Sequence, residues 1–583
     1  MLGAASEQPG VLRVDTVIPP RRLQSQTRVI SQGVGLHGAD VWHNAGYGGS
    51  GVKVGIIDGG FEGFSNLQGS ELPANVTARC YFEGPQRPSA DFADCVEEGT
   101  HGTAVAETLI DVAPNAELYI TNAYSRGDLR DAVDWMAGQG VEVVNVSLGW
   151  TYDGPGDGTS PSSNSPLKTI DAAVSNGITW VNASGNEAFS VWYGPVSDPD
   201  GNGWLHFSGN REVNPLLAEN GDSLFAIMRW DDDWGSADCD LDLVLLQWDA
   251  GNETWVPIEI DAREQDGTAG SIPMAWVGVD RVVDEGRHYA LAMGEAVCST
   301  SPDWIQLIAW DSAVHLYQVS RGHHMGNPEE SRSAGMLAVG AAHYWNTNTI
   351  AEYSSRGPTM DGRTKPDITG VACGTTTTDT PLSVDGRQCW FSGTSQAAPH
   401  VAGMAALVKQ RFPDYSPADV VRYLEQNAVD RGSTGADNTW GHGMAALPLV
   451  EASAPNPALA SPPTGNIEVS DGTNPGEVVV SWDAVDEATY YRIGYVNMVT
   501  DYPLAKASNT GEWLEAFVYV DVNALNFVEQ GGRVEYTVRR LALGVEHAFT
   551  VLTSNDVENT KEHFGGKYSW PSNPRWTFHT TAP

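Results

Sequence analysis

The sequence predicts an α/β fold, in which helices cover both faces of a parallel sheet and two all-β units are added to it. Three observations lead to this prediction. Short apolar runs alternate with helical patterns from Gly51 onward, short β runs interrupt this alternation between about residues 190 and 322, and more β runs follow a Pro/Ala-rich stretch near residue 455. Strands that alternate with helices form parallel sheets that are covered on both sides.

The first part of the chain supplies the alternation. In order, we expect a strand at 52–58, a helix at 103–114, a strand at 116–124, a helix at 128–140, a strand at 141–149, a helix at 169–177 and a strand at 178–186. Asp128 is the expected N-cap of its helix, and Gly138 and Gly140 are expected to end it.

The β runs divide the chain into units. SLFAIMRW, LDLVLLQW, HYALAMG and WIQLIAW predict an inserted β-sandwich-like module, and the α/β unit resumes with the strand GMLAVGAA at 335–342. The predicted division is a flexible lead at 1–30, the α/β unit at 31–190 and 322–450, the insertion at 191–321, a linker at 451–465 and a C-terminal all-β domain at 466–583.

Length and charge limit the possible partners. The chain has 583 residues, enough for several domains, and a formal net charge of −41. A surface this acidic repels nucleic acid and anionic membranes, and no apolar run approaches the ~20 residues of a membrane span. We therefore expect a monomer that works outside the cell or in salty surroundings and binds neither nucleic acid nor membranes.

Cysteine usage favours an oxidising compartment. The six cysteines form three neighbouring couples, and none belongs to a cluster with zinc spacing. Six cysteines allow 15 pairings, of which the local one is the economical choice. Six buried free thiols in a cytosolic protein are the alternative. The couples are Cys80/Cys95, Cys239/Cys298 and Cys373/Cys389.

Four polar residues stand where parallel sheets carry their sites, at or after the carboxyl ends of strands. Asp58 and Asn186 end strands, His101 opens a helix, and Ser395 stands at the start of an Ala-rich helix. A serine nucleophile needs a base and a group that holds the base, roles that suit His101 and Asp58. Asn186 is suited to donate to a developing oxyanion. Taken singly, each residue is better explained as a turn or cap residue; the combination favours catalysis.

The helix that begins near Ser395 has an unusual first turn. Its sequence, GTSQAAPHVAG at 393–403, places Pro399 four residues after the serine. Proline has no N–H, so the carbonyl of Ser395 loses its usual helical partner.

These segments resemble the motifs of the subtilisin-like serine peptidases, the subtilases. VGIIDGGF resembles the family's aspartate motif, HGTAVAE its histidine motif, VNASGNE its oxyanion-asparagine motif and GTSQAAPHVAG its serine motif. They occur in the subtilisin order Asp, His, Ser. The resemblance covers about residues 30–190 and 322–450. It implies a subtilisin-like fold and a secreted endopeptidase that cuts peptide bonds in proteins with Asp58, His101, Ser395 and an Asn186 oxyanion hole.

The resemblance also assigns substrate-binding segments and implies no catalytic cofactor. His400 lies inside the serine motif, but the family's base matches His101. The residues implied to bind substrate are Ser147, Leu148 and Gly149, as an edge strand along the substrate backbone, and Ala183, Ser184 and Gly185, as a wall of the main specificity pocket.

The chain departs from the family pattern at four positions near the catalytic residues. Gly59 stands where a Ser or Thr usually supports the aspartate, and Ala104 stands where a second histidine is usual. Glu107 replaces a glycine and Gln396 a methionine. These departures bear on activity level and pocket shape, because no catalytic group is lost.

Two other functional classes are open to test. One is an inactive or adhesive protein whose β domains bind a partner, which the complete quartet of catalytic motifs disfavours. The other is an esterase, whose GxSxG elbow is absent at Ser395.

Weaker signals concern metal ions and the added domains. DPDGNGW places Asp198, Asp200 and Asn202 at alternate positions, which resembles the start of a structural calcium loop. Gly209 at the twelfth position excludes a full EF-hand, and an Asx-rich turn is the alternative. The acidic segment 230–245 is similar to a β-sandwich module often attached to secreted bacterial peptidases, and the last domain resembles fibronectin type III.

Two expectations concern the ends of the units. The chain starts without an apolar signal core, and 57 residues before Asp58 are too few for an inhibitory prodomain, so we expect both to be absent from this chain. Because both ends of the insertion lie next to the oxyanion strand, we expect it to form one wall of the cleft, lined by Trp192 or Trp204. A module that projects into solvent is the alternative.

Overall fold

The computed structural model describes residues 29–448, apart from 82–87, 97–98, 124, 218–222, 280–288, 299–300 and 311–313, and eight strands between residues 468 and 580. The linker predicted at 451–465 lies outside the described residues, as does the predicted N-terminal lead except for its last two residues.

A seven-stranded sheet forms the centre of the α/β unit, with the order β16-β15-β5-β4-β1-β3-β2. All of its neighbouring strands are parallel, which confirms the predicted α/β class. The strands are β1 (Lys53–Ile57), β2 (Thr77–Ala78), β3 (Glu117–Thr121), β4 (Val143–Val146), β5 (Thr179–Ala183), β15 (Met336–His343) and β16 (Ile368–Ala372).

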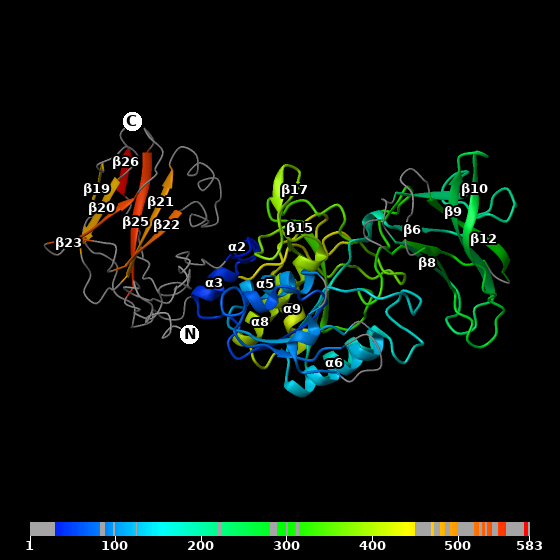
Figure 1. Cartoon of the computed structure of the whole chain (residues 1–583), viewed down its shortest axis with the longest axis horizontal. Coiled ribbons are helices and arrows are strands. Elements are labelled where there is room, and N and C mark those ends of the chain that lie inside the picture. Colours follow the sequence, from blue (N-terminus) through cyan, green and yellow to red (C-terminus); the bar gives the residue numbers. More distant parts are fainter. Residues whose placement is uncertain are drawn as a thin grey trace, which may run out of the picture.

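Helices cover both faces of this sheet (Figure 1). On one face, α5 and α8 pack on Ile56, and on the other, α6 and α7 pack on Ile57, because successive side chains of a strand point to opposite faces. Gly403 lets α5 and α8 approach, since a Cβ there would lie 2.5 Å from Cβ of Val112. The helices are α2 (Gly33–Leu36), α3 (Ala39–Asn44), α4 (Phe64–Leu67), α5 (His101–Val112), α6 (Arg126–Gln139), α7 (Pro166–Ser175), α8 (Thr394–Arg411) and α9 (Pro417–Asn427).

The start of α6 corrects one expectation. Its N-cap is Ser125, whose Oγ accepts a hydrogen bond from the backbone N–H of Asp128 at 3.1 Å. Asp128 is the third residue of the helix, where its carboxylate accepts a bond from the Ser125 hydroxyl at 2.6 Å. The sequence SRGD is thus a local Ser-to-Asp cap, and Asp128 is not the N-cap. Gly140 ends the helix in a left-handed conformation, as predicted.

Strands between residues 191 and 316 form two antiparallel sheets of their own, beside the α/β unit (Figure 1). One has the order β10-β9-β12-β7-β14 and the other β11-β8-β13-β6. Their facing sides share one apolar core around Trp230 and Leu243. The strands are β6 (Val191–Gly194), β7 (Val213–Leu217), β8 (Leu224–Trp230), β9 (Cys239–Asp249), β10 (Thr254–Asp261), β11 (Met274–Val279), β12 (Tyr289–Cys298), β13 (Ile305–Ala309) and β14 (His315–Leu316).

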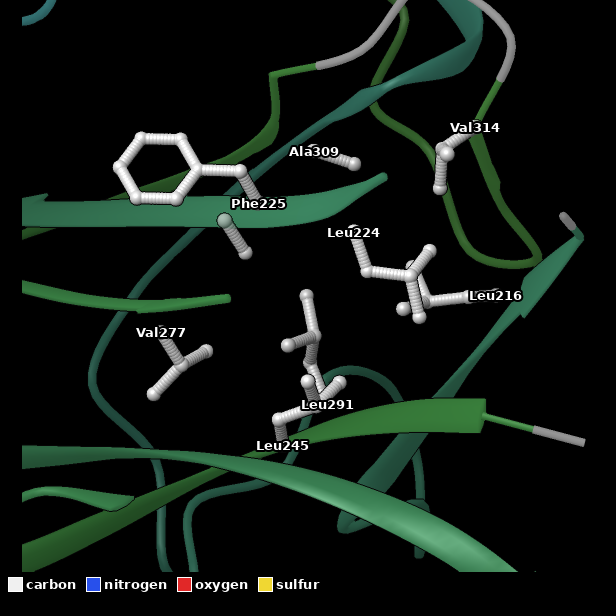
Figure 2. Close-up of a pocket in the computed structure, with 9 residues that line it drawn as sticks. Leu216, Leu224, Phe225, Leu245, Val277, Leu291, Ala309 and Val314 are labelled. Carbon is white, nitrogen blue, oxygen red and sulfur yellow. The ribbon is translucent and has the colours of Figure 1, made fainter. Parts of the chain in front are cut away.

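The core of this insertion is closely packed. Figure 2 shows its cavity, which is lined by apolar side chains such as Leu224, Leu245 and Val277. The volume, ≈ 10 Å³, is at the lower limit for a single water molecule, and the lining is apolar, so the cavity is a packing gap rather than a ligand site. Trp192 also belongs to this core and is 5% exposed, which corrects the expectation that it lines the cleft. Trp204 forms a β-bridge with Gly294 of β12.

A buried ion pair joins the insertion to the α/β unit. Arg229 of β8 is fully buried, and its Nη2 lies 2.9 Å from Oε2 of Glu330. Its Nη1 donates to the carbonyl of Gly154 at 2.9 Å, and its guanidinium lies 3.9 Å from the ring centroid of Tyr152. These contacts fix the base of the insertion against the loops that follow β4 and precede β15.

The eight C-terminal strands form two antiparallel sheets, with the orders β19-β20-β24-β23 and β22-β21-β25-β26. They agree with the predicted all-β class, and the resemblance to fibronectin type III stays a prediction. The strands are β19 (Glu468–Asp471), β20 (Val478–Asp483), β21 (Tyr490–Asn497), β22 (Val518–Asn523), β23 (Val528–Gln530), β24 (Arg533–Val538), β25 (Glu546–Ser554) and β26 (Thr577–Thr580).

All six cysteines are paired, and the pairing is the predicted local one: Cys80–Cys95, Cys239–Cys298 and Cys373–Cys389. The third disulfide closes the hairpin of β17 (Leu382–Val384) and β18 (Arg387–Cys389) onto the end of β16. Among the described helices, none has both the length and the apolar character that a bilayer crossing demands.

Candidate active site

Asp58 and His101 meet at the carboxyl end of β1. Asp58 directly follows the strand and is fully buried, and His101 is the first residue of α5. Nδ1 of His101 donates to Oδ1 of Asp58 at 2.7 Å, and the same oxygen accepts from the backbone N–H of Gly59 at 2.7 Å. Because a carboxylate only accepts, Nδ1 carries the proton in this pair, and Nε2 of a neutral ring keeps its lone pair.

The second oxygen of Asp58 reflects the substitution at the next position. Oδ2 is buried and has no hydrogen-bond partner among the described residues. A serine or threonine at position 59 would place a hydroxyl next to this carboxylate, whereas Gly59 offers only its backbone N–H.

The charge state of His101 depends on two carboxylates. Burial lowers the pKa of its imidazole, but the negative charge and hydrogen bond of Asp58 outweigh burial and raise the pKa above its ordinary value. Asp379 adds to this rise. Its Oδ1 accepts from Thr100 Oγ1 at 3.0 Å, which holds it beside the start of α5. Asp379 was not identified from the sequence, because it lies in a loop without a recognisable motif.

Ser395 is the second residue of α8 and is 9% exposed. The Ser147 hydroxyl, just beyond β4, donates to the Ser395 carbonyl at 3.1 Å. This is the carbonyl that Pro399 cannot serve, so a side chain from a neighbouring strand supplies the missing donor. The first turn of α8 is therefore tied directly to the end of β4.

Asn186 follows β5 and is held by the residue before the serine. Its Oδ1 accepts from the backbone N–H of Thr394 at 3.0 Å and from the Thr394 hydroxyl at 3.1 Å. Because the amide oxygen is used in this way, the amide nitrogen is oriented as a donor toward other groups. Three hydrogen bonds thus link strand ends to helix starts. The end of β1 is linked to α5 by Asp58–His101, and the ends of β4 and β5 are linked to α8 by Ser147–Ser395 and Asn186–Thr394.

The two segments expected to bind substrate continue from these strand ends. Leu148 accepts a bond at its carbonyl from Asn182 Nδ2 at 3.2 Å, and the N–H of Trp150 donates to the Asn327 carbonyl at 2.7 Å. On the other side, Ala183 ends β5, the N–H of Ser184 donates to the carbonyl of Val339 at 3.0 Å, and Gly185 has a φ of 91°.

Two glutamates lie beside these segments, Glu329 buried and Glu187 partly buried. A Cβ on Gly149 would be 3.5 Å from Glu329 Oε1, and Glu329 is 6% exposed. Burial, together with the charge of Glu187, raises the pKa of Glu329 to about 8. Desolvation also raises the pKa of Glu187 to about 7. The hydrogen bond that Glu187 Oε2 accepts from the Ser355 hydroxyl at 2.6 Å lowers this pKa, but by less than desolvation raises it. Sequence reasoning missed both residues because their surroundings are formed by segments distant in the sequence.

Other sequence candidates lie elsewhere. His400 is fully buried in the core, with Nε2 2.8 Å from Ser31 Oγ and Nδ1 3.0 Å from the Val371 carbonyl. Burial lowers its pKa to about 3, so it stays neutral. Asp198, Asp200 and Asn202 lie in the loop between β6 and β7 of the insertion.

A comparison with models of protein families shows to which family the chain belongs. The profile of the subtilase family matches residues 49–210 and 262–443, which is more than half of the chain. The chain belongs to the subtilase family. This subtilase is 25% identical over 426 residues to the minor extracellular protease Vpr of Bacillus subtilis (strain 168), a match that covers 67% of the chain and 49% of the relative.

Further relatives match shorter parts. Serine protease AprX of Bacillus subtilis (strain 168) is 32% identical over 154 residues, covering 23% of the chain and 34% of the relative. Subtilisin BL of Lederbergia lenta is 32% identical over 164 residues, covering 25% and 52%. This subtilase thus spans about half or less of the length of these relatives. The solved structure of the Clostridium perfringens CspB protease is 17% identical, with a TM-score of 0.48, over 70% of this chain and 97% of that one.

Proposed function

We propose that this subtilase is a secreted serine endopeptidase that hydrolyses peptide bonds in proteins through Asp58, His101 and Ser395. The observation that carries the proposal is the 2.7 Å bond from His101 Nδ1 to the buried carboxylate of Asp58, in a chain whose Ser395 begins α8. Family membership and the three relatives described above, all named as proteases or subtilisins, agree with it.

The proposed reaction is acyl transfer. Ser395 Oγ attacks the scissile carbonyl carbon, and its proton passes to Nε2 of His101. The Asp58 carboxylate stabilises the resulting imidazolium. His101 then gives the proton to the leaving amine, so that the C–N bond breaks and an ester to Ser395 remains. Water, activated by the same nitrogen, hydrolyses this ester and regenerates the hydroxyl.

Two donors are proposed for the oxyanion that forms during attack. One is Nδ2 of Asn186, whose orientation follows from the bonds that Oδ1 accepts from Thr394. The other is the backbone N–H of Ser395, which lies in the first turn of α8, where the helix dipole favours negative charge. Ser147–Gly149 and Ala183–Gly185 are proposed to hold the substrate backbone and the side chain before the cleaved bond.

A protein-hydrolysis assay with a Ser395→Ala control tests the proposal. Wild-type protein is expected to cut denatured casein at neutral to alkaline pH, and the variant to lose on the order of 10⁶ in turnover, the magnitude known for the equivalent knockout in subtilisin. Hydrolysis of simple esters without proteolysis would indicate an esterase. Absence of both activities in the folded wild-type chain would indicate a binding protein.

A further inference from the structure

The loop between β6 and β7 gathers carboxylates around a histidine. Asp198, Asp200 and His206 each offer one atom that can bind a metal ion, and these three atoms lie within 4.8 Å of one another. Nε2 of His206 is 3.8 Å from Asp200 Oδ1 and 3.6 Å from Oε1 of Glu212, which precedes β7. These groups belong to the insertion and take no part in the proposed peptidase site.

His206 distinguishes this cluster from an ordinary acidic turn. The residue is 6% exposed, and its Nδ1 lies 2.7 Å from the carbonyl of Gly209. A carbonyl only accepts, so Nδ1 donates a proton to it, and Nε2 is the ring nitrogen that faces the carboxylates and can offer a lone pair to a ligand. Nε2 is buried and has no hydrogen-bond partner within the described part of the chain, an arrangement that is unfavourable unless something binds there.

The distances fit a shared ion better than a direct contact. A hydrogen bond from nitrogen to oxygen spans about 2.7–3.2 Å, less than the 3.6 and 3.8 Å found here. Two ligands of one tetrahedral zinc ion, with bonds of about 2.0–2.2 Å, lie about 3.4 Å apart. A backbone carbonyl on the other ring nitrogen, as Gly209 provides, is also what fixes metal-binding histidines in place.

Asn202 orients the carboxylates. Its Oδ1 accepts from the backbone N–H of Trp204 at 2.9 Å, so its Nδ2 faces the acidic groups. Nδ2 lies 2.8 Å from Glu212 Oε1 and 3.4 Å from Asp200 Oδ2. Asn202 is thus a donor to the carboxylates, in contrast to the ligand role expected from the sequence. Backbone N–H groups of Gly201 and Gly203 hold Asp198 in the same way, at 2.9 Å each.

We propose that Asp198, Asp200 and His206, completed by Glu212, bind one divalent transition-metal ion of the zinc class. A buried imidazole nitrogen favours such an ion over calcium, which prefers an all-oxygen shell. Four protein ligands leave no open position, so the site is structural. The ion fastens the loop that connects β6 to β7, and Asn202 is a positioning residue.

Metal binding is measured on the full-length chain carrying Ser395→Ala, which removes self-digestion. The protein is stripped with a chelator and titrated with Co²⁺, then with Zn²⁺ and with Ca²⁺. One Co²⁺ per chain is expected, with the strong visible absorption of a tetrahedral site. Zn²⁺ is expected to displace it, whereas excess Ca²⁺ leaves it in place.

Variants assign the site to its residues. His206→Asn is expected to abolish the cobalt spectrum. Asp200→Asn, an exposed position that does not threaten folding, is expected to weaken binding at least tenfold, and Asn202→Ala to weaken it by roughly 10–100-fold. His315→Asn, in β14 of the same insertion, is the matched control and is expected to bind Co²⁺ like the parent. The proposal is overturned if the parent binds no Co²⁺, if Ca²⁺ displaces it, or if Asp200→Asn binds as tightly as the control.

Discussion

Glu329→Gln is expected to change how the stability of the catalytic unit depends on pH. Glu329 is 6% exposed, and burial, reinforced by Glu187, raises its pKa from the ordinary 4.5 to about 8. Between these values the folded chain holds a proton that the unfolded chain has released. The free energy of unfolding therefore falls as the pH rises from about 4.5 to about 8.

The size of the effect follows from the two pKa values. Each unit of difference between the folded and unfolded pKa corresponds to about 1.4 kcal/mol, so the full rise in pH costs the wild type at most about 5 kcal/mol at this residue. Glutamine does not titrate and escapes this loss. A change of 1 kcal/mol moves the unfolding midpoint of a unit of this size by about 2–4 °C. Between pH 5 and pH 9, the midpoint of the wild type is therefore expected to fall by roughly 10 °C more than that of the variant.

Calorimetry in the Ser395→Ala background measures this difference without self-digestion. The unfolding midpoints of both chains are compared at pH 5 and pH 9. Glu117→Gln, at an exposed position of β3, is the matched control and is expected to follow the wild type. If Glu329→Gln loses as much stability as the wild type over this interval, the carboxyl is not held protonated by burial, and the reasoning is refuted.

Three further predictions address other parts of the molecule. Asp379→Asn removes a negative charge that raises the pKa of His101, so the acid limb of the kcat/KM profile is expected to move to lower pH. Arg229→Ala leaves Glu330 buried without its cation, and denaturant unfolding is expected to show a loss of about 3–5 kcal/mol. Replacing both Cys80 and Cys95 by serine opens a loop with a sequence separation of 15 and is expected to cost ~3 kcal/mol by calorimetry.

Each of these predictions has a contrary result. An unchanged acid limb in Asp379→Asn would mean that solvent screens this carboxylate from His101. An Arg229→Ala variant as stable as the wild type would show that Glu330 finds another partner or is neutral. Unchanged stability without Cys80 and Cys95 would mean that the unfolded chain is not restrained by this disulfide.

The sequence predicted the α/β class and the candidate quartet because both depend on local patterns. Apolar runs of strand length mark β1 and β5; Asp58 follows β1 directly, and Asn186 follows β5 after Ser184 and Gly185. The local disulfide pairing was predicted for a similar reason, since neighbouring cysteines close the shortest loops. The cap of α6 was misassigned although its signal was readable, because Ser125 and Asp128 together form the cap.

The remaining features depend on contacts between distant segments. The Ser147 hydroxyl donates to the carbonyl of Ser395, which is 248 positions away in the sequence, and no sequence pattern near either residue predicts this hydrogen bond. His206 stood outside the expected calcium loop because only the folded loop buries its ring and engages Oδ1 of Asn202 with the N–H of Trp204. Trp192 or Trp204 was expected at the cleft because no pattern near Trp192 shows that its ring packs against Phe207 and that β6 pairs with β13 in the core of the insertion.

The most direct test of the central claim is covalent labelling of the nucleophile. The purified chain is treated with a serine-directed phosphonate, and the modified peptide is located by mass spectrometry. We predict a single adduct on Ser395, which is lost in Ser395→Ala and forms far more slowly in His101→Ala. An adduct on another serine, or labelling of Ser395 at the wild-type rate in His101→Ala, would contradict the proposed triad.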